Sequence, residues 1–389
     1  MTLTFGLAYS YSDFFIPLET TFGWSHAVDS SVASISLLVF SVGSLLGGQL
    51  ASRVGFRRLC YAGALLVGFG TMASSQISGF WELVALFGIV TSLGTAFVVV
   101  IASGLVVKWF VRRRGFAVGI MAAGSGFGTL VVPQVAQVLI SWRDWRTSFL
   151  FLGVGFLGLL LAASYFMRAP EELSIKPYGW HSMTEEQRQS SGHYTIKEAM
   201  STLRFWMVYS MFFLGSFSAA MFIVHVVPFA RTFGINETTG SIALGIFGAG
   251  SLISRLTVGV ISDRVSRTLL IVISFLSEAS AMVALPFVAS NALLLMACAF
   301  GIGFGYGGFI SDFLALTGDL FGSRWTYKIW SVDETAYGIG GLIGPIFAGA
   351  YFDAFGTYAG AFETGAALAL FGLFLSIIFP RTLKAHQTI

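Results

Sequence analysis

Residues 240–263 read GSIALGIFGAGSLISRLTVGVISD, an apolar run that holds one charged residue, Arg255, before it ends at Asp263. A bilayer core about 30 Å thick needs about 20 apolar residues of α-helix, so this run can cross a membrane. A guanidinium inside such a run is costly, by a contested ~3 kcal/mol or more, and marks a candidate functional site. The stretch therefore predicts a membrane helix that contains a functional charged residue.

The whole chain has the composition of a membrane protein. Of its 389 residues, 56% are apolar and 11% are charged, whereas an ordinary soluble domain has roughly 45–50% and 25%. Scanning for runs of about 20 apolar residues predicts an all-α integral membrane fold with twelve transmembrane helices in a lipid bilayer. We expect them near residues 2–18, 32–52, 58–77, 82–106, 116–139, 147–167, 206–230, 240–261, 268–288, 292–315, 329–352 and 359–379.

The basic residues orient the chain. Of the 22 Lys and Arg residues, 18 fall in alternate connections and in the C-terminal tail. Because cytoplasmic loops retain Lys and Arg, we expect a multi-pass protein of the cytoplasmic (inner) membrane with both termini in the cytoplasm. The N-terminus has no basic region and no cleavage site, so residues 1–18 predict a first membrane helix instead of a signal peptide. The basic residues are dispersed, so nucleic-acid binding is not expected.

An internal repeat divides the chain into two similar halves. PLETTFG at residues 17–23 aligns with PFARTFG at residues 228–234, and GFGTLVVP at residues 126–133 aligns with GIGGLIGP at residues 338–345. The offsets are 211 and 212 positions. Parallel repeats of six spans are typical of transporters that rock two bundles around a site at the bilayer midplane.

One long polar segment separates the six spans of each half. We therefore predict an N-terminal six-helix bundle at residues 1–167, a cytoplasmic linker at 168–205 and a C-terminal six-helix bundle at 206–389. The two bundles should be pseudo-symmetric, because they carry the repeated strings.

A loop motif in residues 259–267, GVISDRVSR, resembles the signature of the major facilitator superfamily: glycine, three residues, Asp-Arg, one residue, glycine, then basic residues. The resemblance places Asp263 and Arg264 at gating positions. It places Arg53 at the matching position of the N-terminal copy, GQLASRVGFRR at residues 48–58. Ser52 stands where the family usually has Asp, so we expect a weaker lock of the cytoplasmic gate in that half.

Further strings resemble the monocarboxylate transporter and oxalate/formate antiporter branch of that superfamily. They are YSYSDFFIP at 9–17, KWFVRRRGFAVG at 108–119, WR at 145–146, HVVPFA at 225–230, and GGLIGP at 340–345 ahead of Asp353. The resemblance implies a small organic anion as substrate, with Arg255 on the eighth helix as its anchor. Members of the branch usually carry further residues before Tyr9, so we expect the first helix to lack its cytoplasmic end.

Arg255 is the first candidate for substrate binding. It lies eight residues before Asp263, about 12 Å into the membrane from the cytoplasmic helix end. Its planar guanidinium suits a carboxylate. The alternative is a structural ion pair with an acid such as Asp13 or Asp312.

Asp13 and His225 are candidates for proton coupling. They lie almost one repeat apart, each about 8 Å inside the outer end of the first helix of its half. A histidine titrates near neutral pH, and a buried carboxyl can hold a proton, so either can carry a coupling proton. A hydrogen bond between helices is the alternative for His225, and contact with outside water for Asp13.

Four more acids lie within predicted helices. Asp312, Asp333 and Glu334 lie near cytoplasmic helix ends, and we expect them to serve gating or pairing with basic residues of the adjacent loop. Glu278 lies within the ninth helix, where an interhelical hydrogen bond in the protonated form is expected over a proton site.

Three tyrosines and two glycine runs within the predicted spans also have expected roles. Tyr306 and Tyr337 reach mid-depth and, with Tyr9 of the branch motif, are candidates for donating hydroxyls to a substrate. The glycine runs at residues 301–308 and 124–128 mimic a dinucleotide fingerprint but lack the strand and the acidic residue that it needs. We expect them to allow close helix packing.

These features favour secondary transport of a monocarboxylate, such as lactate or pyruvate, or of a small dicarboxylate, such as oxalate. Transport would proceed by alternating access, as proton symport or as exchange for a counter-anion. A drug or metabolite exporter is the alternative within the class, and a transport-derived receptor or sensor is the alternative outside it. No HExxH motif, nucleophile pair or metal cluster appears in the spans, so we expect no enzyme, no metal and no cofactor. We expect a functional monomer.

Overall fold

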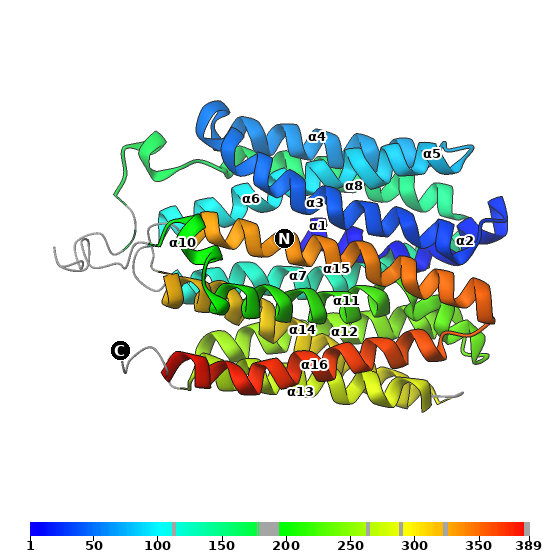
Figure 1. The fold of residues 1–389 in the computed structure, drawn as a ribbon. Helices are drawn as coiled ribbons and strands as arrows, with labels where there is room; N and C mark the ends of the chain where they lie inside the picture. Colours follow the sequence, from blue (N-terminus) through cyan, green and yellow to red (C-terminus); the bar gives the residue numbers. More distant parts are fainter. Residues whose placement is uncertain are drawn as a thin grey trace.

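The computed structural model describes residues 1–110, 114–176, 178, 194–261, 265–287, 291–321 and 326–384. Its long helices run side by side in one elongated bundle (Figure 1). The helices of the N-terminal half are α1 (Thr2–Tyr9), α2 (Tyr11–Phe22), α3 (His26–Val54), α4 (Phe56–Ser74), α5 (Phe80–Leu83), a π-helical segment (Val84–Thr91), α6 (Ser92–Trp109), α7 (Arg114–Trp142) and α8 (Trp145–Phe166). Those that follow are α10 (Ile196–Met200), α11 (Leu203–Thr232), α12 (Glu237–Ile261), α13 (Arg267–Ala284), α14 (Ala292–Phe321), α15 (Thr326–Phe355) and α16 (Ala359–Lys384).

Within the described residues, ten helical segments are long and apolar enough to cross a membrane, and they match ten of the twelve expected spans. The expected span at residues 2–18 is instead two shorter helices, α1 and α2, that meet at Ser10. The Ser10 hydroxyl donates to the Leu7 carbonyl, a back-bond that competes with the helical ladder and bends the chain. The other expected span is α4, where Arg57 and Arg58 in the first turn lower the mean hydropathy.

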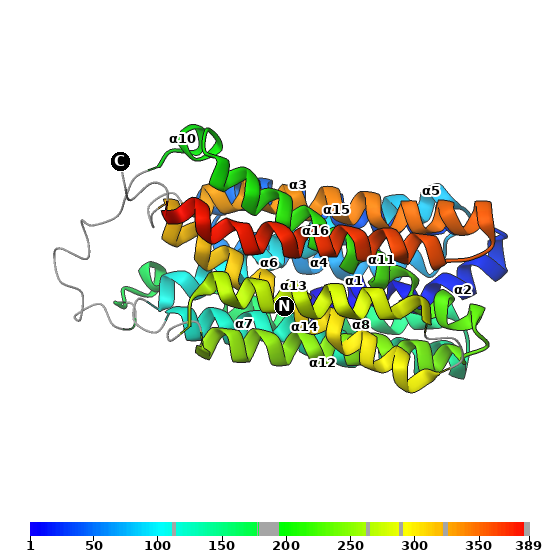
Figure 2. The ribbon, with the colours of Figure 1, turned by 60° about the horizontal axis from the view of Figure 1, so that its bottom comes forward.

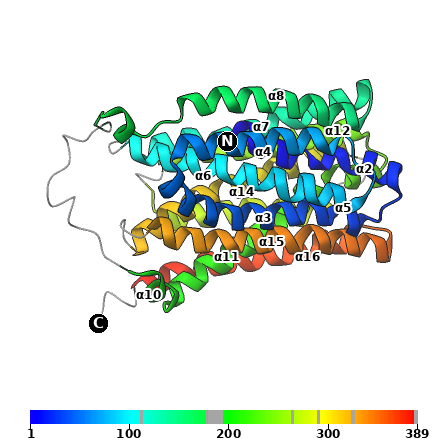
Figure 3. The same cartoon turned by 90° about the horizontal axis from the view of Figure 1, so that it is seen from above.

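The helix packing repeats between the halves. Two extensive contacts join them: α3 lies against α15, and α7 lies against α12. Within the halves, α4 packs on α8 as α13 packs on α16, and α3 packs on α6 as α12 packs on α14. Figures 2 and 3 show α3 beside α15 from two directions. Each contact has a counterpart six spans later, as a duplicated unit requires.

Local geometry repeats as well. Pro17 lies inside α2, and Pro228 lies inside α11. Gly23 ends α2 with φ of 67°, and Gly234 follows α11 with φ of 71°. This left-handed conformation favours glycine, so the repeated strings place a left-handed glycine at or just after the helix end in both halves.

The glycine run of α14 lets three helices pack closely. A Cβ on Gly303 would overlap the Phe247 backbone of α12, and a Cβ on Gly305 would overlap Ser274 and Glu278 of α13. The glycine run of α7 meets α1 and α12 in the same way. The expected role in close helix packing is therefore confirmed for both runs.

The bundle has two distinct ends. The short helix α10 and the C-terminal end of α16 lie together at one, called the linker end here (Figures 1 and 2). The helix α2 and the short α5 lie toward the opposite end, called the far end.

Candidate functional site

Three tyrosine hydroxyls meet where the halves touch. The Tyr9 hydroxyl at the end of α1 lies 2.5 Å from that of Tyr306 on α14 and 3.1 Å from that of Tyr337 on α15. Tyr306 and Tyr337 are 3.4 Å apart. All three side chains are buried. The structure thus brings together the three tyrosines that the sequence proposed for substrate binding; we call them the tyrosine cluster.

Arg255 lies beside Tyr306 of the tyrosine cluster. Its side chain is 7% exposed, and its guanidinium carbon lies 6.0 Å from the centroid of the Tyr306 ring. Nε donates to Ser251 Oγ at 3.1 Å, one helical turn earlier on α12. Among the described residues Arg255 forms no ion pair, and neither Asp13 nor Asp312 pairs with it. The fixed ion pairs considered from the sequence are therefore absent there.

Two small cavities flank Tyr9 and Tyr337. Each has a volume of about 20 Å³, about what one water molecule needs. Helices of both halves supply their walls: Ser36 and Leu37 of α3 line both cavities, and Tyr306 lines one. The bundle is therefore closed around the tyrosine cluster.

Asp13 is buried on α2 where the halves meet, instead of facing outside water. Neither of its carboxylate oxygens accepts a hydrogen bond from a described residue. The side chain of Ser241 on α12 lies close to the Asp13 carboxyl group across the interface. Gln134 of α7 donates a hydrogen bond to the Ser241 carbonyl at 2.7 Å. Asp13 is therefore a buried acid between the halves, next to a hydroxyl of the opposite half.

His225 forms hydrogen bonds between helices, which is the alternative to proton coupling that the sequence left open. Its Nδ1 lies 3.0 Å from the Tyr358 hydroxyl, and its Nε2 lies 2.9 Å from the Pro345 carbonyl. The Pro345 carbonyl can only accept, so Nε2 donates to it. Both nitrogens of this buried ring are engaged with α15 and the start of α16, so His225 links helices within the C-terminal half.

The remaining acids do not join the tyrosine cluster. Asp333 accepts a hydrogen bond from Thr317 of α14 at 3.1 Å, and one oxygen of the buried Asp312 has no partner among the described residues. Glu334 meets α3 through its carbonyl, which accepts from Ser41 at 3.2 Å. Glu278 is buried, and neither oxygen has a described hydrogen-bond partner, so the expected interhelical hydrogen bond is absent there.

Residues 262–264, the centre of the loop motif, lie outside the described residues. Asp263 and Arg264 are outside the described residues. Arg53, their counterpart in the N-terminal half, is exposed in the last turn of α3. Gating by these three residues stays a prediction.

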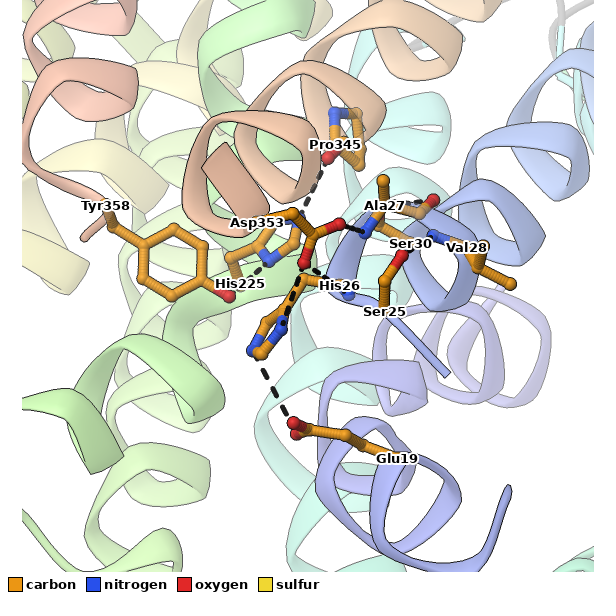
Figure 4. A network of polar contacts seen from close by, with 10 residues as sticks. All are labelled: Glu19, Ser25, His26, Ala27, Val28, Ser30, His225, Pro345, Asp353 and Tyr358. Carbon is orange, nitrogen blue, oxygen red and sulfur yellow. Dashed lines mark hydrogen bonds and ion pairs between the residues drawn. The ribbon is translucent and has the colours of Figure 1, made fainter. Parts of the chain in front are cut away.

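A polar network at the far end was missed by the sequence analysis. Nδ1 of His26 lies 3.6 Å from Oδ1 of Asp353, and Nε2 lies 3.9 Å from Oε2 of Glu19 (Figure 4). Asp353 comes from α15 and Glu19 from α2, so the network joins the halves. Asp353 had been noted only as part of a family string. No sequence signal places it beside His26, because 327 residues separate them.

The profile of the Major Facilitator Superfamily matches residues 1–228 and 205–388 of the chain. Monocarboxylate transporter 12 of Homo sapiens is 26% identical over 385 residues, which cover 90% of this chain and 72% of that protein. The oxalate:formate antiporter of Oxalobacter formigenes is 23% identical over 359 residues, covering 90% and 82%. Monocarboxylate transporter 2 of Homo sapiens is 26% identical over 282 residues, covering 67% and 58%.

These matches agree with the repeated helix packing and with the charged and phenolic groups buried between the halves. The resemblance noted from the loop motif is thereby confirmed, and with it the assignment to a transporter. The chain is a multi-pass membrane transporter that belongs to the Major Facilitator Superfamily.

Proposed function

We propose that the protein is a secondary active transporter of a small monocarboxylate or dicarboxylate, working by alternating access as a proton symporter or an anion exchanger. One observation carries the proposal: Arg255 is a buried cation with no carboxylate partner among the described residues, and it lies beside Tyr306, which lines one of the cavities. A guanidinium binds carboxylates in a bidentate manner. The relatives that are monocarboxylate transporters and an oxalate:formate antiporter support this substrate class.

The architecture that we propose has two six-helix bundles, at residues 1–167 and 206–389, joined by a linker at 168–205. The paired contacts α3–α15 and α7–α12 support it, because exchanging the halves turns one contact into the other. In this arrangement α1–α2 and α4 complete the twelve spans. The charge bias supports an orientation in the cytoplasmic membrane with the linker end in the cytoplasm and the far end outside. The proposed functional unit is a monomer.

The closed cavities fit a step in this cycle. With a volume of about 20 Å³ each, they have room for about one water molecule and are too small for a carboxylate. In the proposed cycle, an anion reaches Arg255 after Tyr306 and Tyr9 separate, which moves α14 away from α1. Binding at Arg255 and opening between the halves are thus linked through one pair of hydroxyls.

Export of amphiphilic metabolites is the second candidate. It is favoured by the aromatic residues Phe5, Phe40 and Phe87, which line one cavity together with Tyr9. Rings pack against apolar solutes regardless of charge, so this wall suits an amphiphile as well as a small anion.

Uptake into proteoliposomes separates the two candidates. Radiolabelled lactate, pyruvate, oxalate and formate are offered with and without a pH gradient, and as counter-anions inside the vesicles. We expect at least one of the four to accumulate above the level of protein-free vesicles. If none of the four anions is transported and a fluorescent lipophilic cation is, the carboxylate proposal is refuted and export of amphiphilic metabolites takes its place.

A further inference from the structure

His26 lies between two carboxylates that belong to different halves of the protein. Its imidazole nitrogens lie 3.6 Å from Asp353 and 3.9 Å from Glu19 (Figure 4). The side chains of His26, Glu19 and Asp353 are 12%, 32% and 29% exposed, so the group is partly buried but reached by solvent. We call these three residues the far-end network.

Asp353 also caps the first turn of α3. Its two carboxylate oxygens accept hydrogen bonds of 2.9 Å each from the backbone N–H groups of His26 and Ala27. A carboxylate at a helix N-terminus satisfies free N–H groups and complements the helix dipole. Gly349 allows this approach, because its Cα lies against the His26 carbonyl and Ser30, where a Cβ would overlap both. The helix start is thus completed by a residue of the opposite half.

The attraction between the three side chains of the far-end network depends on whether the His26 imidazole carries a second proton. Asp353 keeps its two backbone hydrogen bonds whether or not His26 is charged. Glu19 has no such substitute within the described structure, and two carboxylates on either side of a neutral imidazole repel each other. A protonated imidazole donates from both nitrogens and attracts both acids.

The other charged and titratable groups around His26 do not replace it. His225 of α11 is held by Tyr358 and the Pro345 carbonyl. Tyr358 stays neutral, because burial raises its pKa well above the usual value. Burial of the imidazole, which is the largest effect, and the positive charge of Arg231 on α11 both oppose protonation of His26, whereas Glu19 and Asp353 favour it.

Asp29 of α3 is a further acid in the described region near His26. It accepts a hydrogen bond of 2.5 Å from Tyr11 within the N-terminal half. It therefore has a partner of its own and does not pair with His26 in this structure.

We propose that His26 is a proton-binding site that holds the outer side of the transporter closed. A proton from the outside water adds to the imidazole, and the resulting cation joins Glu19 and Asp353 across the two halves. Loss of that proton leaves two acids facing a neutral ring and favours opening between α3 and α15. The inference rests on the proposed alternating access and orientation, but not on the identity of the transported anion.

The test measures how fast the cavity opens to the outside. In a background with Cys60→Ser and Cys298→Ser, the variant Ser36→Cys places a thiol on the cavity wall. A membrane-impermeant thiol reagent is applied to right-side-out vesicles between about pH 5 and 8, the range in which histidine titrates. The exposed Gln76→Cys, in the connection before α5, corrects for the ionisation of the thiol itself.

We expect the corrected labelling rate to rise about tenfold from the acid to the alkaline end, as two partly exposed ion pairs are lost. His26→Gln should label fast at every pH, and Glu19→Gln should show a weakened pH dependence with normal expression. An unchanged pH profile in His26→Gln, or no profile in the parent, would overturn the proposal. Labelling needs no substrate, so a failure of the carboxylate proposal leaves this result readable.

Discussion

The hydroxyl oxygen of Tyr9 lies 2.5 Å from that of Tyr306, although 297 residues separate the two in the chain. The contact joins α1 to α14, and Tyr337 completes it from α15. Each phenol can donate one hydrogen bond and accept others, so the three hydroxyls satisfy one another in the buried interface. In the transport cycle that we propose, an anion reaches Arg255 after this arrangement breaks. Under the proposed function, the tyrosine cluster closes the path between the halves and supplies hydrogen-bond donors to an incoming carboxylate.

Replacing Tyr306 by Phe tests the donor role. The variant keeps the ring beside Arg255 but removes the hydroxyl that meets Tyr9. A net hydrogen bond contributes about 0.5–1.5 kcal/mol, so we expect KM for the transported anion to rise roughly 2- to 12-fold. Tyr209→Phe, whose hydroxyl meets Thr335 away from the cavities, is the matched control and should retain the parent KM. Equal KM values in both variants would remove Tyr306 from the binding site.

Arg255→Lys and Arg255→Ala test the anchor. Lysine keeps the charge but loses the planar fork, and alanine loses both. Charged hydrogen bonds contribute about 1.5–3 kcal/mol, so we expect KM to rise roughly 10- to 150-fold in the lysine variant. Uptake should be lost in the alanine variant. The neighbouring Ser254→Ala controls for disturbance of α12. Wild-type uptake by Arg255→Ala would refute the anion anchor.

Asp13→Asn tests proton coupling. The amide removes the exchangeable proton of the carboxyl group at nearly the same size. We expect gradient-driven accumulation to be lost while exchange of internal for external anion continues. Asp29→Asn, which changes a buried acid hydrogen-bonded to Tyr11, should keep accumulation. If Asp13→Asn concentrates the anion as the parent does, the coupling proton is carried elsewhere.

Gly303→Ala and Gly155→Ala test the packing role of glycine. A Cβ on Gly303 meets the Phe247 backbone, whereas nothing lies within 4 Å of a Cβ on Gly155. We expect the first variant to lower the free energy of unfolding by about 1–3 kcal/mol through overpacking. The second should be neutral or raise it by up to about 1 kcal/mol. Thermal unfolding in detergent compares them, and an equal effect of both would contradict the packing argument.

Asp144 supplies a pH-dependent cap for α8. Its carboxylate accepts from the Thr147 backbone N–H at 2.6 Å, and this hydrogen bond holds the pKa of Asp144 below its usual value. The contribution is therefore present above the unfolded-state pKa of about 3.9 and is lost as the pH falls through the folded-state pKa. We expect Asp144→Ala to cost about 1 kcal/mol at neutral pH.

The matched variant at this cap is Asp144→Asn, because asparagine caps helices well without titrating. It should keep most of the parent stability at neutral pH and lose the dependence on acid. A cost for the alanine variant that stays constant from neutral pH to below pH 4 would contradict the cap's titration.

The sequence alone determined the class of fold and the family. Apolar runs longer than a bilayer is thick can only be satisfied as helices in lipid, because every backbone N–H and C=O must find its partner within the segment. Ten of the expected spans follow from that rule. Arg255 stood out for the same reason, since a charge in such a run has no solvent to pair with.

Only the tertiary structure decided which side chains meet. Hydropathy gives each helix a length but no rotation about its axis, so nothing in the sequence placed Tyr9 against Tyr306 or His26 against Asp353. The same limit explains His225, whose titratable ring is engaged by Tyr358 and the Pro345 carbonyl. Contacts between distant residues depend on helix packing, which small residues permit but which the pattern of apolar residues does not specify.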